Sequence, residues 1–292
     1  MINHVPGAAH RPIRRFFGEQ TAAVLNPEEP TTPPDLGQVP EALTAFSKQL
    51  KAAYYSAGSM AYESLRSSKL YSDFRNVTAQ LAVFSPASLG SRSSRLAFWI
   101  NLYNLLIIDA AISFRIERST RERRGFFSQA AYTIGGLRYS ANDIEHGILR
   151  ANASRPHFPR KQFRRGDPRL ALAFDQVDPR IHFALNCAAR SCPPIAVYTP
   201  DRIDAELNQA AWVFVNGGGI EVEPDANTIS LSMIFKWYQR DFSGGQAGRR
   251  GLRRMLAYAA PFVEDPLHRE MLLQEHPVPR ITYQPYDWSI NK

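Results

Sequence analysis

The chain has 292 residues, of which 44% are hydrophobic, enough for a folded domain with a sizeable core. Its longest apolar stretch, residues 96–112, is interrupted by two asparagines and an aspartate, so we expect a buried helix and no membrane span. The first 15 residues lack the apolar segment of a secretory signal, and we therefore expect a cytoplasmic protein.

Positive charge is the main bias of the composition. The net charge of +8 comes largely from arginines gathered in residues 115–124, 155–169 and 249–254. A basic surface favours an anionic partner, such as an acidic protein, a lipid headgroup or nucleic acid, although solvated loops and helix ends are the plainer explanation. No zinc-finger, aromatic RNA-binding or KH-type motif accompanies the arginines, so we predict no specific nucleic-acid recognition.

The predicted elements begin after a proline-rich arm. Residues 1–40 include the run 26–37, whose prolines exclude a helix or a central strand, so we expect this arm to be flexible. A helical region is expected at about 41–81. Serines then cap a helix over 93–112 that is apolar on almost every side, which is typical of a buried helix. Candidate core residues of the first helical region are Tyr54, Tyr55, Leu65 and Phe74.

Further along, glycines and prolines mark turns and loops. Gly135–Gly136 suits a tight turn between strands at 132–134 and 137–139, and the basic, proline-interrupted residues 151–177 predict a loop. The remaining predicted elements are helices at 200–216, 233–242 and 249–263, a second hairpin formed by 220–223 and 228–232, and an extended C-terminal segment at 280–291.

These elements predict an α+β fold. We expect one mainly helical domain over residues 41–292, with small antiparallel hairpins, preceded by the flexible arm of residues 1–40. There is no internal repeat and no convincing second linker, which favours a single domain.

Thiol chemistry, if the protein has any, is confined to one segment. The only two cysteines, Cys187 and Cys192, lie five residues apart, and Cys192 precedes two prolines. In a reducing compartment such a pair favours free thiols, a redox pair or metal ligands over a structural disulfide. The Cys-x4-Cys spacing is not the usual zinc knuckle, so we expect no bound metal and no cofactor.

A thiol nucleophile needs a base, and two histidines are candidates. His146 follows Glu145 in a short helix that Ser140 or Asn142 could cap, and His182 lies among apolar neighbours. An adjacent imidazole favours the thiolate that attacks a substrate. The alternatives are a buried structural cysteine, a surface Glu-His pair and a core histidine.

Polar residues also interrupt the buried helix. Asn101, Asn104, Ile108 and Asp109 share nearly one face, because residues three, four, seven and eight apart in a helix lie on one side. This stripe could form the wall of a polar cavity, in which Asp109 pairs with a cation or orients a histidine. The alternative is that the asparagines bind loop backbone, as buried amides commonly do.

A set of motifs occurs in order over about residues 90–291. They are Phe98–Asn104 (FWINLYN), Ile134–Gly136 (IGG), Asp143–His146 (DIEH), Asp178–Leu185 (DPRIHFAL), Ser191–Pro194 (SCPP), Trp237–Tyr238, Asp241–Phe242 and Tyr286–Ser289 (YDWS). Together they resemble the domain-of-unknown-function 547 family. The resemblance implies a single domain, found in bacteria and, fused to other modules, in plants and animals, and it implies no settled activity. Carried over to this chain, the family pattern marks Asn101, Asn104, Glu145, His146, His182, Cys192, Asp287 and Trp288.

Our leading hypothesis is a cysteine-dependent hydrolase or acyltransferase that acts on an amide, ester or thioester bond. The substrate is a small molecule or an acyl or peptide compound. Cys192 is the nucleophile and His146 or His182 the base, and an acidic or amide side chain orients the imidazole. Candidates for that orienting role are Glu145, Asn101, Asp109 and Asp287. Candidate substrate-binding residues are Asn104, Asp109, Arg190, Asp287 and Trp288.

Two other functions stay open. In the first, the protein is a non-catalytic binding or scaffold module whose basic face docks an acidic partner, and its binding is sensitive to salt. In the second, it is a zinc-assisted hydrolase, in which Cys187, Cys192 and a histidine hold the metal.

Overall fold

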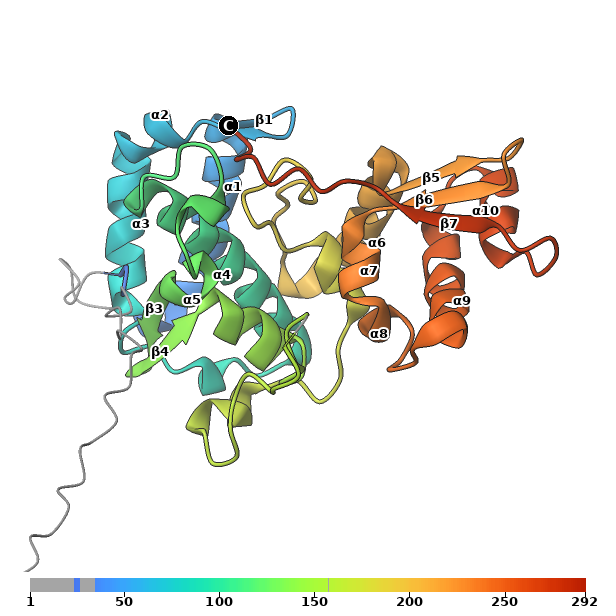
Figure 1. Cartoon of the computed structure of the whole chain (residues 1–292). Coiled ribbons are helices and arrows are strands. Elements are labelled where there is room, and N and C mark those ends of the chain that lie inside the picture. Colours follow the sequence, from blue (N-terminus) through green and yellow to red (C-terminus); the bar gives the residue numbers. More distant parts are fainter. Residues whose placement is uncertain (1–23, 27–34, 157) are drawn as a thin grey trace, which may run out of the picture.

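The computed structural model describes residues 24–26, 35–156 and 158–292 (Figure 1). In this part of the chain the secondary structure is mainly helical with small sheets, which confirms the α+β class. The helices are α1 (Val39–Tyr54), α2 (Tyr62–Arg66), α3 (Lys69–Gln80), α4 (Arg92–Ser113), α5 (Phe126–Gln129), α6 (Ile203–Phe214), α7 (Met233–Trp237), α8 (Gln239–Phe242), α9 (Gly248–Ala259) and α10 (Pro266–Leu273). The strands are β1 (Tyr55–Ser56), β2 (Ser59–Met60), β3 (Ala131–Ile134), β4 (Leu137–Ser140), β5 (Ile220–Glu223), β6 (Thr228–Leu231) and β7 (Arg280–Tyr283).

Helix α4 is the centre of the larger hydrophobic cluster, as its composition predicts. Ser91 caps it by accepting a hydrogen bond from the Ser94 backbone, and every residue of 96–112 is buried. By length and hydropathy alone α4 could cross a membrane, but 94% of its most apolar window is buried inside the protein. A helix that is apolar all round needs such enclosure, and here neighbouring elements supply it.

The elements around α4 differ in one respect from the prediction. The helical region expected at 41–81 is divided into α1, α2 and α3. The β1–β2 hairpin separates α1 from α2, because it reverses the chain at Ala57 and Gly58, which both have positive φ. Leu65 and Phe74 are buried as expected, whereas Tyr54 and Tyr55 are partly buried and pack against the same cluster.

The hairpin predicted at Gly135–Gly136 is present as β3 and β4. Both glycines have positive φ (55° and 77°), which suits the tight turn that joins two antiparallel strands. Their N–H groups donate to the carbonyls of Leu81 and Ala82, so the turn is fastened to the end of α3.

Most of the predicted flexible arm lies outside the described residues. Two described arm residues, Leu25 and Asn26, are buried against β3. The Asn26 amide donates to the carbonyls of Thr78 and Thr133 and accepts from the Thr133 N–H. At this point the arm is therefore held by the domain, because one asparagine side chain satisfies backbone groups of two elements.

A second hydrophobic cluster forms from the later part of the chain. Strands β5 and β6 pair antiparallel as predicted, but β7 joins β6 in parallel, so this sheet is mixed. Helices α6 to α9 correspond to the predicted helices, whereas α10 was not predicted. Figure 1 shows the helices and strands that carry most of the second cluster, in orange and red, beside the elements of the first.

The C-terminal segment returns from β7 to the first cluster (Figure 1). Its residue Ile290 bridges to Ala189, and Asn291 accepts hydrogen bonds from the Met60 N–H and, at 2.6 Å, from the Tyr62 hydroxyl. The segment expected to be extended at 280–291 thus consists of strand β7 followed by residues 284–291, which we call the strap. The strap brings Tyr286 and Trp288 to the place where the two clusters meet.

Candidate active site

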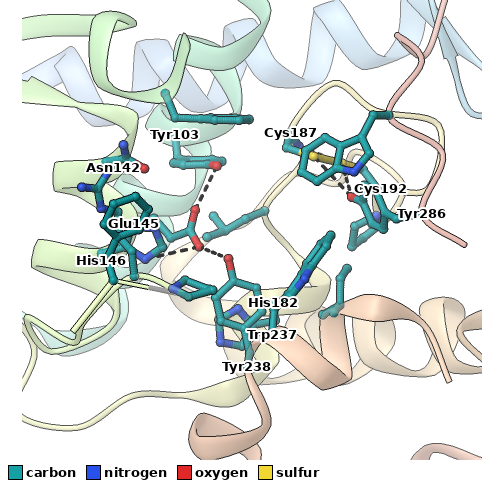
Figure 2. A pocket seen from close by; sticks show the side chains of 18 of the residues that line it. Tyr103, Asn142, Glu145, His146, His182, Cys187, Cys192, Trp237, Tyr238 and Tyr286 are labelled. Carbon is teal, nitrogen blue, oxygen red and sulfur yellow. Dashed lines mark hydrogen bonds and ion pairs between the residues drawn. A yellow bond between two sulfur atoms is a disulfide. The ribbon is translucent and has the colours of Figure 1, made fainter. Parts of the chain in front are cut away.

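A cavity of about 440 Å³ lies where the two clusters meet (Figure 2). This is within the size range of ligand sites in proteins. Four of the predicted catalytic residues line it, namely Cys192, His146, His182 and Glu145. The other lining residues include Tyr103 from α4, Leu185 and Cys187 from the segment after His182, Trp237 and Tyr238 at the end of α7, and Tyr286 and Trp288 from the strap.

The two cysteines form a disulfide in this structure. The expectation of free thiols or metal ligands is therefore wrong for this state, while that of a redox pair is compatible with it. The chain turns tightly between the cysteines, with Ala188 at φ 63°, and the Asn186 side chain accepts from the Ala188 N–H and donates to the Pro193 carbonyl. This turn leaves the Cα atoms 6.2 Å apart, a separation that a disulfide can span.

The hydrogen-bond donors around Cys192 come from the backbone and from the strap. The Cys187 N–H donates to Cys192 Sγ at 3.0 Å, and the Tyr286 hydroxyl lies 3.2 Å from Cys192 Sγ and 3.3 Å from Cys187 Sγ. Among the described residues neither histidine is a hydrogen-bond partner of either sulfur. The cysteine and the histidines thus share a cavity without touching, as Figure 2 shows.

Glu145 is held in a wide helical turn, the π-helical segment Asp143–Leu149. Ser140 caps this segment, as one of the two predicted caps, by accepting from the Asp143 N–H. The carboxylate of Glu145 accepts from the Tyr103 hydroxyl at 3.1 Å and from the Tyr238 hydroxyl at 2.6 Å.

These contacts keep Glu145 ionised. Burial alone would raise its pKa, but the His146 ring, the Tyr238 hydrogen bond and the Arg150 guanidinium lower it overall. Burial and the neighbouring carboxylate raise the pKa of Tyr103 and Tyr238 well above 10, so both stay protonated donors.

A buried ion pair joins the two hydrophobic clusters beside the cavity. Arg150 Nε and Nη2 donate to Asp241 Oδ2 and Oδ1 at 2.6 and 3.1 Å, and the two side chains are only 5% and 8% exposed. Asp241 Oδ2 also lies 2.8 Å from His182 Nε2. Burial opposes the charge of Asp241, but the hydrogen bonds from His182 and Arg150 hold its pKa far below the usual range, so it is ionised.

The hydrogen bonds fix the tautomer of His182. Its Nε2 faces an ionised carboxylate and therefore carries a proton, while Nδ1 has no hydrogen-bond partner in the described part of the chain. Burial lowers the pKa of His182 despite the attraction of Asp241, so the ring is neutral at pH 7 and Nδ1 offers a lone pair. The ring stacks on Tyr238 with centroids 3.7 Å apart, which fixes its plane.

The opposite tautomer holds at His146. Arg150 Nη1 lies 2.9 Å from His146 Nδ1, and because a guanidinium only donates, Nδ1 accepts and the proton is on Nε2. Burial, together with the nearby Arg150, Arg155 and His182, lowers the pKa of His146 to about 4 despite the attraction of Glu145. At neutral pH the site thus combines a histidine lone pair on His182 with a histidine N–H on His146.

The lowered pKa of His146 predicts a loss of stability on mild acidification. Between about pH 6.5 and 4 the unfolded chain binds a proton at this position that the folded protein does not, so stability falls as pH falls through this window. We expect the wild type to be less stable at pH 5 than at pH 7 by on the order of 2 kcal/mol from this residue alone. Urea unfolding of the wild type and of His146→Gln at both pH values measures the difference.

The interval from pH 5 to pH 7 is chosen to separate the effect of His146 from the effects of nearby carboxylates. The carboxylates Glu145 and Asp241, whose pKa values are lowered, lose their contribution only below about pH 4.5, outside the interval compared. His182 adds to the loss in both proteins, because burial lowers its pKa too. An unchanged stability difference between pH 5 and pH 7 in His146→Gln contradicts the assignment.

The asparagines of α4 brace loops instead of lining the cavity. The Asn101 side chain donates to the Tyr198 carbonyl at 2.7 Å and accepts from the Tyr198 N–H at 3.0 Å. Asn104 likewise donates to the Ala184 carbonyl and accepts from the Asn186 N–H. Both asparagines thus hydrogen-bond loop backbone, as the alternative expected, and neither is among the residues that line the cavity.

Asp109 lies at a different place in the core. It accepts hydrogen bonds from the Tyr71 and Tyr132 hydroxyls at 2.5 and 2.7 Å and pairs with Arg75 at 3.1 Å. The expected cation partner exists, but it ties α4 to α3 and β3, and Asp109 does not line the cavity.

The remaining predicted site residues divide between the cavity and the surface. Trp288 lines the cavity. Arg190 is exposed, and Asp287 is a surface residue whose Oδ1 accepts from the N–H and hydroxyl of Ser289. Asp287 therefore shapes the strap, and it orients neither histidine.

Several residues of the site were not predicted as such. They are Arg150 and Asp241, which fix the histidines, and Tyr103, Tyr238 and Tyr286, which contact Glu145 and the sulfurs. The sequence carried a signal only for those inside the quoted motifs, namely Tyr103, Tyr238, Asp241 and Tyr286.

The described residues contain no group of three or more histidine, cysteine, aspartate or glutamate side chains that could hold a metal ion. Because both cysteines are bonded to each other, the ligand set that a zinc-assisted hydrolase would need is not assembled in this state.

Comparison with known proteins assigns a family to part of the chain. The family model described as a protein of unknown function, DUF547, matches residues 86–215. This range includes Glu145, His146, His182 and both cysteines, whereas Tyr238, Asp241 and the strap lie beyond it. No curated protein and no solved structure matches the chain. Residues 86–215 of the chain thus match the DUF547 family of proteins of unknown function.

Proposed function

We propose that the reduced protein is a thiol-dependent hydrolase or acyltransferase with Cys192 as its nucleophile. One observation carries the proposal: Cys192 lines the same cavity as two neutral histidines of opposite tautomer, and two hydrogen-bond donors point at its sulfur. The substrates that fit best are thioesters and aryl esters. We also propose a cytoplasmic location, because a reducing compartment keeps the two cysteines as thiols.

The first step is the formation of the thiolate. A dithiol reductant supplies two electrons and two protons, the disulfide opens, and Cys187 and Cys192 become thiols. The Cys187 N–H and the Tyr286 hydroxyl already point at Cys192 Sγ, and hydrogen bonds to a charged form favour that form. Cys192 can thus lose its proton to solvent without direct contact with a histidine.

The second step is acylation. The thiolate attacks the substrate carbonyl, and the His146 Nε2–H is the group suited to donate to the developing oxyanion. The carbon–leaving-group bond then breaks, and the leaving group takes the electron pair. Since both histidines are neutral at pH 7, the site has no strong acid for an amine leaving group. A thiolate or a phenolate leaves without protonation, which favours thioesters and aryl esters over amides.

The third step releases the acyl group. Water attacks the acylated Cys192, and His182 Nδ1 accepts its proton, while Asp241 stabilises the imidazolium through Nε2. Cys192 leaves as a thiolate and the carboxylic acid departs. An acceptor alcohol or thiol in place of water gives acyl transfer.

The leaving-group argument predicts a substrate preference. Reduced protein should hydrolyse S-phenyl thioacetate and 4-nitrophenyl acetate and leave 4-nitroacetanilide unchanged, and the oxidised protein should hydrolyse none of them. The measurement is the initial rate with each substrate, before and after treatment with dithiothreitol, with denatured protein as the blank. Equal rates in the oxidised and reduced protein contradict a thiol mechanism. Hydrolysis of the anilide at a rate comparable to that of the esters contradicts the neutral state assigned to the two histidines.

A non-catalytic binding module is the rival function. The exposed arginines of α9, at positions 249, 250, 253 and 254, support it, because they form a basic face away from the cavity. Salt-sensitive binding of an acidic partner, without turnover of any ester and unaffected by Cys192→Ala, would favour it over the enzyme.

A further inference from the structure

The cavity has an aromatic wall of which the proposed reaction uses only the Tyr286 hydroxyl. Trp237 at the end of α7 packs against Tyr286 and Trp288 of the strap, with ring centroids 4.9 and 5.6 Å away, and Tyr286 and Trp288 are 4.7 Å apart. All three rings line the cavity. Aromatic side chains grouped in this way offer flat apolar faces on which another planar group can stack.

Two arginines line the same cavity. The Arg121 guanidinium lies over the Trp288 ring, 4.1 Å from its centroid, and Arg155 is close enough to His146 to lower the pKa of that histidine. Neither arginine forms an ion pair with a carboxylate among the residues that the structure describes. Among the described residues, Glu145 is the one carboxylate that lines the cavity, and it accepts hydrogen bonds from two tyrosine hydroxyls.

The cavity therefore combines flat apolar faces with two arginines that form no ion pair with a described carboxylate. We infer that it takes a planar aromatic acyl group that carries an anionic substituent, with the ring against Trp237, Tyr286 and Trp288 and the anion paired with Arg121 and Arg155. That this ligand is an acyl group rests on the proposed function. That the cavity binds a planar aromatic ring with an anionic substituent does not. A volume of about 440 Å³ accommodates a two-ring aromatic acid.

The test measures binding without catalysis. Full-length Cys192→Ala protein is titrated with 2-naphthoate and with 2-naphthamide in a calorimeter, since the two probes share a ring system and differ in charge. We expect 2-naphthoate to bind at least about fivefold more tightly, which corresponds to one modest ion pair, and to lose this advantage at high salt. Equal affinities, or no binding of 2-naphthoate, overturn the inference.

Variants test which side chains bind the anion of the ligand and which bind its ring. Arg121→Gln and Arg155→Gln should each weaken 2-naphthoate and leave 2-naphthamide unchanged, and Trp288→Leu should weaken both. Arg249→Gln is the matched control, because Arg249 is exposed on α9 and does not line the cavity. If Arg249→Gln loses as much 2-naphthoate affinity as Arg121→Gln and Arg155→Gln, the effect comes from the net charge of the protein, and the inference is overturned.

The outcome separates this inference from the proposed function. If Cys192→Ala binds 2-naphthoate as expected but the reduced wild type turns over no ester, the inference stands and the function fails. If the wild type hydrolyses thioesters but its cavity does not prefer the charged probe, the function stands and the inference fails.

Discussion

Replacing Cys192 by alanine is expected to lower kcat/KM of the reduced protein toward S-phenyl thioacetate on the order of a thousandfold or more. The reason is that, apart from Cys187, no described side chain in the cavity offers a nucleophile of comparable strength: Glu145 is hydrogen-bonded by two tyrosines, and the tyrosines that contact it stay protonated. The measurement is the initial rate at several substrate concentrations in the presence of dithiothreitol.

Cys187→Ala is the matched control. It removes the other half of the disulfide but keeps the backbone N–H that donates to Cys192 Sγ. We expect this variant to retain activity within a few fold and to need no reductant, since Cys192 is then a free thiol. Loss of activity in Cys187→Ala together with full activity in Cys192→Ala would exchange the roles of the two cysteines, and full activity in both would exclude a cysteine nucleophile.

Asp241→Ala is expected to destabilise the protein by about 3–5 kcal/mol, the usual cost of removing one partner of a buried ion pair. The substitution leaves the Arg150 guanidinium without its carboxylate in a place where its side chain is only 5% exposed, and it removes the partner of His182 Nε2. Urea unfolding at pH 7 measures the loss. Since Asp241 and Arg150 come from segments 91 residues apart, the pair also fastens the two hydrophobic clusters to each other.

The control is an exposed ion pair. Lys69 and Asp73 lie one turn apart on α3, with side chains 85% and 54% exposed. Asp73→Ala should change stability by less than about 1 kcal/mol, because exposed pairs are screened by water. If Asp241→Ala costs no more than Asp73→Ala, the Arg150–Asp241 pair does not hold the clusters together.

Much of the fold could be predicted because local pattern determines it. Helix α4 is apolar on nearly every side, and only burial accommodates such a helix, whatever surrounds it. The Gly135–Gly136 pair specifies its hairpin through backbone conformation alone. The β1–β2 interruption carried a weaker signal, since Ala57 adopts positive φ without being a glycine. The parallel β6–β7 pairing depends on a contact about 50 residues away in the sequence, which no local pattern reveals.

The site was predicted in part, for a similar reason. Rare reactive residue types identified Cys192, His146, His182 and Glu145, and all four line one cavity. Residue type and helical spacing also suggested Asn101, Asn104 and Asp109, but sharing a helix face does not show which neighbour covers it. Loop backbone covers the two asparagines, and Arg75, Tyr71 and Tyr132 surround Asp109.

The residues that set the histidine tautomers could not be found this way. Arg150 is one arginine in a basic chain, and nothing in its sequence neighbourhood distinguishes it from the solvated arginines that follow it. Its role arises from Asp241, which only the folding of α8 against the first cluster brings near. The disulfide likewise depends on a tight turn at Ala188, a residue type that does not signal positive φ.

The most direct test of a Cys192 nucleophile is mass spectrometry of the acylated protein. Reduced wild type and His182→Gln are mixed with 4-nitrophenyl acetate for seconds, quenched in acid, digested and sequenced. We expect an acetyl group on the peptide at Cys192, present in larger amount in His182→Gln because the base for its hydrolysis is missing, and none at Cys187. Ester turnover with no acyl group on Cys192 in either protein would contradict the mechanism.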